Sequence, residues 1–220
     1  MKDHLRRAKA FVSSTLEKAL ARETDIKTAT TTPPEESTPE LSGTIRYWGI
    51  PVSRTKDTAY LIDISGSMGW DINGNGVTLL DLAKEQLFDV LGNLAESTKF
   101  NVILFDGVIE PWEAAPQLAT AKNLGRAQKF VRKHGPRGST NIYDPLELAL
   151  RNGGIDELYL LSDGHPNTGA YVHPEDITSA VATLNQKNKV KIHTIALGHD
   201  SPLLEKLSSD SNGQHRIVCT

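Results

Sequence analysis

The chain has 220 residues, 38% of them hydrophobic and 23% charged, which suits one folded domain of about 150 to 200 residues with an appended segment. Its formal net charge of −3 gives no indication of the concentrated basic surface that binds nucleic acid. The one cysteine, Cys219, excludes an intrachain disulfide and a thiolate metal site, and no apolar run reaches the roughly 18 residues of a membrane span.

Residues 1–22 are predicted to form an amphipathic helix, because apolar side chains recur at helical spacing among charged ones. Such a helix packs on its own domain or on a neighbour. Attachment to a membrane surface is the alternative, which the single aromatic residue and the acidic residues of the polar face disfavour. The basic N-terminus lacks the roughly 7 to 15 apolar residues of a signal peptide, so we expect a cytoplasmic protein. The apolar positions are Leu5, Phe11, Val12, Leu16 and Leu20.

Residues 23–43 are predicted to be a linker, because threonine and proline dominate the stretch. This composition does not form a packed element, and the segment should be extended or disordered. The folded domain is therefore assigned to residues 44–220.

From residue 57 onward, predicted strands and helices alternate with short loops between them. This order predicts an α/β fold of the Rossmann-like, doubly wound kind. Its central sheet should be mostly parallel, with about six strands, one short antiparallel edge and helices on both faces. The predicted strands are residues 58–64, 100–105, 108–112, 157–162, 190–197 and 215–218, and the predicted helices are residues 78–97, 121–134, 143–151, 174–186 and 202–209.

Oxygen-bearing side chains follow the strands at the rim where such sheets bind ligands. Asp63 and Asp163 each come directly after an apolar strand, and Thr140 precedes a helix. Because the carboxyl ends of parallel strands share one rim, we expect the two carboxylates to meet there. Asp63, Ser65 and Ser67 alternate by two in an extended turn, so their side chains can face one point.

An oxygen-only ligand set suits a hard cation such as Mg²⁺, Mn²⁺ or Ca²⁺. Ser65, Ser67 and Thr140 would be neutral ligands, and neutral ligands leave the metal electrophilic. Such a metal favours an acidic ligand supplied from outside, whereas a cage of four carboxylates would remove that demand. The pattern therefore predicts a cation site with a coordination position open to a partner.

Three motifs together resemble the metal-ion-dependent adhesion site of von Willebrand factor type A domains. They are Asp-x-Ser-x-Ser at residues 63–67, Gly-x-Thr at 138–140 and Ser-Asp-Gly at 162–164. The segments at 47–52 and 102–106 resemble the lead-in and the second strand of bacterial members of this family. The resemblance covers about residues 44–220, in the expected order.

The resemblance implies a role for each of the five residues. Ser65 and Ser67 would coordinate the cation directly, and Thr140 would do so once a partner carboxylate is bound. Asp63 and Asp163 would act mainly through bound water. The cation would be Mg²⁺, with Mn²⁺ or Ca²⁺ as alternatives, and a partner protein would supply an aspartate or glutamate.

Further residues are assigned to the rim of this site. Trp70 follows the metal loop and is expected to be exposed at a binding face. His165 follows Asp163 by two positions, and Asn141 follows Thr140. We predict that Trp70, Asn141 and His165 contribute to partner binding. For Trp70 the alternative is packing in the core or on the rim.

Residues 71–76 match the first half of a calcium-binding loop, Asp-x-Asn-x-Asn-Gly. The second half fails, because the twelfth position is Leu82 rather than a bidentate glutamate. A second calcium site with Asp71, Asn73 and Asn75 is one interpretation. The other is a glycine-rich turn that caps the next helix through Thr78.

The favoured function is a non-enzymatic binding module that captures an acidic residue through the cation. The alternative is a metal-dependent hydrolase or phosphotransfer protein that uses Asp63 and Asp163. Against it, the sequence has neither a phosphate-binding glycine loop nor a nucleophile elbow, and the one basic residue near the motifs is Arg137. A structural domain with an unused metal site is the third reading.

Overall fold

The computed structural model describes residues 45–72, 74 and 76–219. The predicted N-terminal helix at 1–22 and the predicted linker at 23–43 lie outside the described residues, as do Asn73 and Asn75 of the calcium half-loop. No helix in the described part of the chain is long and apolar enough to cross a membrane.

The described chain is built on a sheet of seven strands in the order β5-β4-β3-β7-β8-β9, with β6 also paired to β4. Five strands run parallel, which confirms the predicted mostly parallel α/β fold. The strands are β3 (Thr58–Asp63), β4 (Lys99–Phe105), β5 (Ile109–Pro111), β6 (Gln117–Leu118), β7 (Glu157–Ser162), β8 (Lys191–Leu197) and β9 (His215–Val218).

The antiparallel edge differs from the prediction, because it holds two short strands instead of one. β5 pairs with the end of β4, where Phe105 faces Ile109, and β6 pairs with its beginning, where Lys99 faces Leu118. β6 was not predicted, because two residues are too short to show an alternating pattern.

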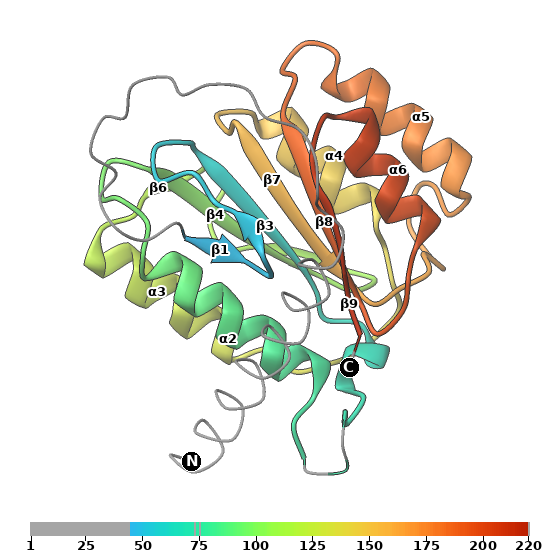
Figure 1. Ribbon diagram of the computed structural model, residues 1–220, viewed down its shortest axis with the longest axis horizontal. Helices are drawn as coiled ribbons and strands as arrows, with labels where there is room; N and C mark the ends of the chain where they lie inside the picture. The colour runs from blue at the N-terminus through green and yellow to red at the C-terminus, as the bar shows by residue number, and fades with distance from the viewer. Residues whose placement is uncertain (1–44, 73, 75, 220) are drawn as a thin grey trace, which may run out of the picture.

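Helices cover both faces of the sheet, as Figure 1 shows. One face carries α2 and α3 with a hairpin of β1 and β2, and the other carries α4, α5 and α6, each face with its own hydrophobic cluster. The bounds are β1 (Arg46–Tyr47), β2 (Ile50–Pro51), α2 (Leu79–Leu91), α3 (Ala121–Arg132), α4 (Tyr143–Asn152), α5 (Pro174–Asn185) and α6 (Pro202–Asp210).

The central strand β3 is buried along its whole length and contributes to both clusters. Successive side chains of a strand point to opposite faces. Ala59 and Leu61 therefore belong to the cluster under α4, whereas Tyr60 and Ile62 belong to the cluster under α2. Burial on both faces explains the unbroken apolar run that marks this strand in the sequence.

Helix α2 is shorter than the predicted helix at 78–97, because it ends at Leu91. Gly92 and Asn93 follow, two residues of low helix propensity, and the Asn93 side chain donates to the Asp89 carbonyl at 2.7 Å. The start agrees with the prediction, since Thr78 caps α2 and exchanges hydrogen bonds with Asp81 in a capping box. The other predicted elements end within two residues of the observed bounds.

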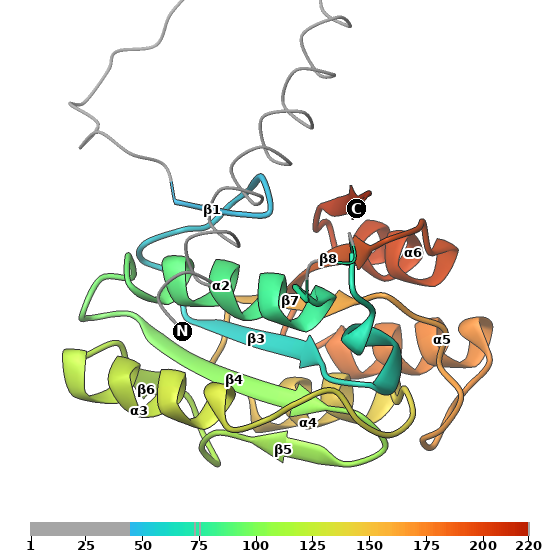
Figure 2. The same ribbon diagram turned by 90° about the horizontal axis from the view of Figure 1, so that it is seen from below.

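Strands β3 and β7 are parallel neighbours, with Thr58 facing Glu157 and Ile62 facing Leu161. Their carboxyl ends therefore lie side by side. Figure 2 shows the loops that follow β3 and those that precede α4 and α5 gathered at this end of the sheet.

Candidate metal-binding site

The first segment of the candidate site is the turn after β3. The carboxylate of Asp63 accepts a hydrogen bond from the backbone N–H of Ser65 at 2.7 Å, which fixes the start of the turn. A single 3₁₀ turn, Gly66–Gly69, then brings the hydroxyl oxygens of Ser65 and Ser67 to 3.1 Å from each other. Met68 is fully buried and anchors this turn in the core.

The second segment is the end of β7. The Ser67 hydroxyl donates to Asp163 Oδ1 at 3.0 Å, so the two segments touch directly. Ser162, which is fully buried, donates its hydroxyl to Asp63 Oδ2 and accepts the Gly164 N–H at 3.0 Å. Ser162 therefore joins the two aspartate loops. The Ser-Asp-Gly motif predicted a ligand role for Asp163, but it does not predict this contact of Ser162.

The third segment carries Thr140. The Gly138 carbonyl accepts the Gly66 N–H at 3.2 Å, which ties this loop to the first. The Thr140 N–H donates to Asn167 Oδ1 at 2.9 Å, and a Cβ atom at Gly164 would lie 3.6 Å from Thr140 Oγ1. The structure thus brings all three predicted segments to one place.

An ion-pair network supports the loop that carries Thr140. The backbone N–H of Arg137 donates to the Ile64 carbonyl at 2.7 Å, and its Nε lies 3.1 Å from Asp106 Oδ2. A second guanidinium nitrogen of Arg137 pairs with Glu110. Asp106 is buried, and Gly138 adopts a φ of +69° directly against it. Sequence reasoning did not find this network, because its members come from separate segments.

Two carboxylates lie in the site without a compensating positive charge. Asp63 is fully buried and Asp163 is 8% exposed, and no ion pair among the described residues includes either of them. Burial, with a smaller contribution from the nearby Asp163 charge, raises the pKa of Asp63 to about 6, although hydrogen bonds from Ser162 and Ser65 oppose the shift. A bound cation would relieve this charge.

The spacing of the oxygens fits a small divalent cation. Mg²⁺ holds oxygen ligands at about 2.0–2.1 Å in an octahedron, which places neighbouring ligands about 2.9 Å apart. Ser67 Oγ lies 3.1 Å from Ser65 Oγ and 3.0 Å from Asp163 Oδ1. In the described part of the chain, no group of three or more histidine, cysteine, aspartate or glutamate side chains offers an alternative site.

The predicted rim residues have different surroundings. Trp70 is 74% exposed, and His165 is exposed with its ring centroid 5.3 Å from that of His199. Asn141 is buried instead of lying on the rim. Its amide nitrogen donates to Asp144 Oδ2 at 2.7 Å and its oxygen accepts the Asp144 N–H at 3.2 Å. The first turn of α4 uses both polar atoms of this side chain, and a role of Asn141 in partner binding stays a prediction.

Asp71 belongs to the turn before α2. Its Oδ2 accepts the Gly76 N–H at 2.8 Å, and its backbone forms an isolated bridge with Thr78. These contacts agree with a glycine-rich turn that leads into the helix cap. The second calcium site remains a prediction, because Asn73 and Asn75 lie outside the described residues.

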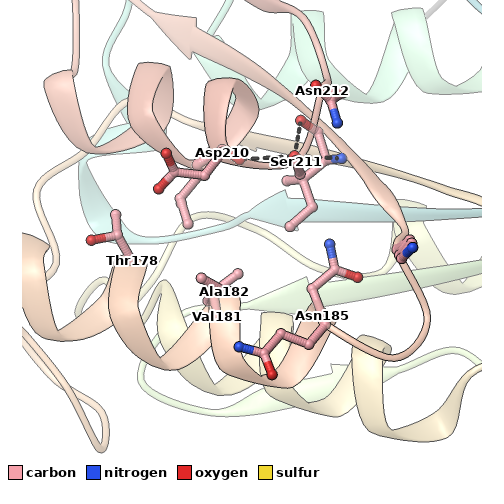
Figure 3. A pocket seen from close by; sticks show the side chains of 11 residues that line it. Thr178, Val181, Ala182, Asn185, Asp210, Ser211 and Asn212 are labelled. Carbon is pink, nitrogen blue, oxygen red and sulfur yellow. Dashed lines mark hydrogen bonds between the residues drawn. The ribbon is translucent and has the colours of Figure 1, made fainter.

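A pocket of about 450 Å³ lies between α5 and α6, toward their C-terminal ends (Figure 3). Its polar groups serve the fold. Asn185 exchanges hydrogen bonds with the backbone of Val190, and the Ser211 hydroxyl accepts the Ile192 N–H at 3.0 Å and donates to the Leu207 carbonyl at 2.9 Å. We assign this pocket no part in the candidate site.

The family profile of the von Willebrand factor type A domain matches residues 57–217. The chain belongs to this family. It is 29% identical over 179 residues to von Willebrand factor A domain-containing protein 3A of Homo sapiens, which covers 80% of the chain. It is 27% identical over 173 residues to inter-alpha-trypsin inhibitor heavy chain H1 of Mesocricetus auratus, which covers 72%. The chain spans only 14% and 18% of the length of these relatives.

Solved type A domains share the fold. One from Catenulispora acidiphila covers 76% of this chain and 39% of its own length, with a TM-score of 0.63 and 19% identity. Proximal thread matrix protein 1 from the mussel byssus was solved with a zinc-occupied adhesion motif. It covers 75% of this chain and 44% of its own length, with a TM-score of 0.57 and 19% identity. Type A domains are typically protein-interaction modules, and this chain has their architecture.

Proposed function

We propose that this type A domain captures a carboxylate of a partner protein through a divalent cation, with Mg²⁺ as the first choice and Mn²⁺ or Ca²⁺ as alternatives. Ser65 and Ser67 coordinate directly, Thr140 joins when the partner binds, and Asp63 and Asp163 act mainly through water. The observation that carries the proposal is the hydroxyl of Ser67 placed between Ser65 and Asp163 at the spacing of a cation shell.

The charge of the site supports an acidic partner. Two carboxylates offset the charge of a divalent cation, and the remaining ligands are neutral hydroxyls. Because hydroxyls donate less electron density than carboxylates, the cation retains affinity for one more anionic oxygen. A partner aspartate or glutamate supplies it, and the domain itself carries out no chemical step.

The surroundings of the site disfavour the hydrolase or phosphotransfer alternative. Phosphate chemistry requires cationic side chains that bind the transferred group. Arg137 is the basic residue nearest the motifs, and its guanidinium already pairs with Asp106 and Glu110. In a phosphatase and esterase panel we expect no metal-dependent turnover, and turnover that Asp163→Ala abolishes would favour the enzyme instead.

Calorimetry with MgCl₂ and MnCl₂ tests the cation site. We expect one cation per wild-type chain, an affinity at least tenfold lower for Ser67→Ala and Thr140→Val, and little change for Thr140→Ser, which retains the hydroxyl. Ser179→Ala, at an exposed position of α5, is the matched control and should bind like wild type. Equal heats of cation binding for wild type and Ser67→Ala would exclude a cation site at these residues.

Partner capture is tested by a pull-down in Mg²⁺ and in chelator. We expect partners that are lost in chelator and with Thr140→Val but retained with Ser179→Ala. Cation binding without any cation-dependent partner would leave a structural domain with an unused metal site and overturn the proposal.

A further inference from the structure

Exposed apolar side chains are concentrated around the candidate metal site. The described residues expose five large hydrophobic side chains. Trp70 follows β3, Val108 lies in the turn after β4, and Tyr171 lies in the loop between β7 and α5, so these three share the rim of the site. Leu118 lies at the opposite end of the sheet, beside the start of β4, and Ile217 lies on the edge strand β9, near the carboxyl end of the sheet. Apolar surface that gathers at one place marks an interaction site, whereas scattered apolar residues do not.

A pocket of about 500 Å³ continues this surface. It lies between the loop 164–166 and the first turns of α5 and α6, and its walls include Pro166, Val172 and Leu203. Gly164 lines the pocket and directly follows Asp163, so one loop borders both the cation position and the pocket. A segment whose carboxylate reaches the cation therefore has this pocket beside it.

The charged groups of the pocket disfavour a second acidic residue. Glu175 lies in the first turn of α5 and would repel it. The ammonium of Lys206, which also lines the pocket, is held by Asp210 at 3.0 and 2.9 Å. The surface thus offers one electrophilic point, the cation, beside a pocket that has apolar walls, one acidic side chain and a lysine already paired with Asp210. Its complement is a single carboxylate with apolar neighbours.

We propose that the partner of this domain is a protein segment with one aspartate or glutamate flanked by bulky apolar side chains. One of these occupies the pocket at Val172 and Leu203, and others pack on Trp70 and the rim. This inference rests on the proposed function and adds to it the class of partner sequence.

A displayed peptide library tests the proposal. Each peptide carries one fixed central aspartate or glutamate with four randomised positions on either side, and binders are selected in MgCl₂ and eluted with EDTA. We expect leucine, isoleucine, phenylalanine or tryptophan to be enriched within three positions of the acid. The best peptide should bind Val172→Ser and Trp70→Ser at least tenfold more weakly than wild type, while calorimetry shows unchanged Mg²⁺ binding.

Leu118→Ser is the matched control, because Leu118 is an exposed apolar residue away from the rim, and it should bind the peptide like wild type. Peptides eluted by EDTA with polar or acidic neighbours would overturn this inference and leave the proposed function standing. Equal peptide affinity for Val172→Ser and wild type would also overturn it. The absence of any cation-dependent peptide would overturn the proposed function as well.

Discussion

At the scale of single residues, Asp63 carries the largest electrostatic cost in the candidate site. It ends a fully buried strand and lies close to a second carboxylate, so its charged form loses hydration without gaining a cationic neighbour. Hydrogen bonds from Ser65 and Ser162 reduce this cost only in part. An acid in such a position is expected where the protein binds a metal.

The pKa of Asp63 predicts how the metal-free domain responds to pH. Burial raises this pKa from 3.8 to about 6, so the folded state holds its proton more tightly than the unfolded state. The contribution of Asp63 to stability is greatest below about pH 4 and is lost as pH rises through 6, by about 2 to 3 kcal/mol. Asp63→Asn should remove this dependence in urea unfolding at pH 4 to 8 in EDTA.

Asp89→Asn, at an exposed position of α2, is the control and should follow the wild-type pH dependence. If Asp63→Asn in EDTA loses stability between pH 4 and 7 as steeply as wild type, Asp63 is not the group responsible.

At the scale of elements, the loop before α4 depends on Gly138. The residue has a φ of +69°, and a Cβ atom there would lie 2.6 Å from Asp106 Oδ2. Only glycine adopts this conformation without strain, and only glycine leaves room for the Asp106–Arg137 pair. The position of the Thr140 hydroxyl therefore depends on a residue two positions earlier.

Gly138→Ala is predicted to destabilise the domain by about 1 to 3 kcal/mol, because it adds backbone strain and a contact with a buried carboxylate. It should also weaken Mg²⁺ binding in calorimetry at least tenfold, since the loop must shift. Gly125→Ala is the matched control. Gly125 lies within α3 with no atom within 4 Å of an added Cβ, so alanine there should stabilise the domain by about 0.5 to 1 kcal/mol. Mg²⁺ binding at wild-type strength by Gly138→Ala would contradict the dependence of the site on this loop.

At the scale of the whole molecule, the sheet is a rigid base for three loops that are far apart in sequence. Ser67 and Asp163 are 96 positions apart, yet their side chains form a hydrogen bond. A cation bound between these loops would link segments that separate on unfolding. Because it binds the folded chain and not the unfolded one, it stabilises the fold by mass action.

Mg²⁺ at about one hundred times its dissociation constant should add about 2.7 kcal/mol of stability and raise the Tm by about 5 to 10 °C. The shift should be larger at pH 8 than at pH 5, because a proton on Asp63 competes with the cation below its pKa of about 6. Differential scanning calorimetry measures both effects, with NaCl at equal ionic strength as the control. An equal shift in NaCl, or one that persists in Asp163→Asn, would show that the stabilisation is not site-specific.

Most of the elements and all of the candidate ligands could be predicted from local patterns in the sequence. The apolar run of β3, the alternation of strands and helices and the cap at Thr78 are local patterns, and local patterns remain visible without a structure. Because strand ends share a rim, the positions of Asp63 and Asp163 after apolar strands were enough to predict that they meet.

Which other residues support the site depends on how the elements pack. Ser162 bridges two loops, Asn141 donates a hydrogen bond to Asp144 at the start of α4, and Arg137 forms ion pairs with two acidic residues. None of these contacts follows from sequence spacing. The pocket beside Val172 likewise arises where two helices and a loop from separate parts of the chain come together. The physical reason is the same in each case: periodicity reports which side of an element is buried, whereas contacts between distant segments depend on how the elements pack.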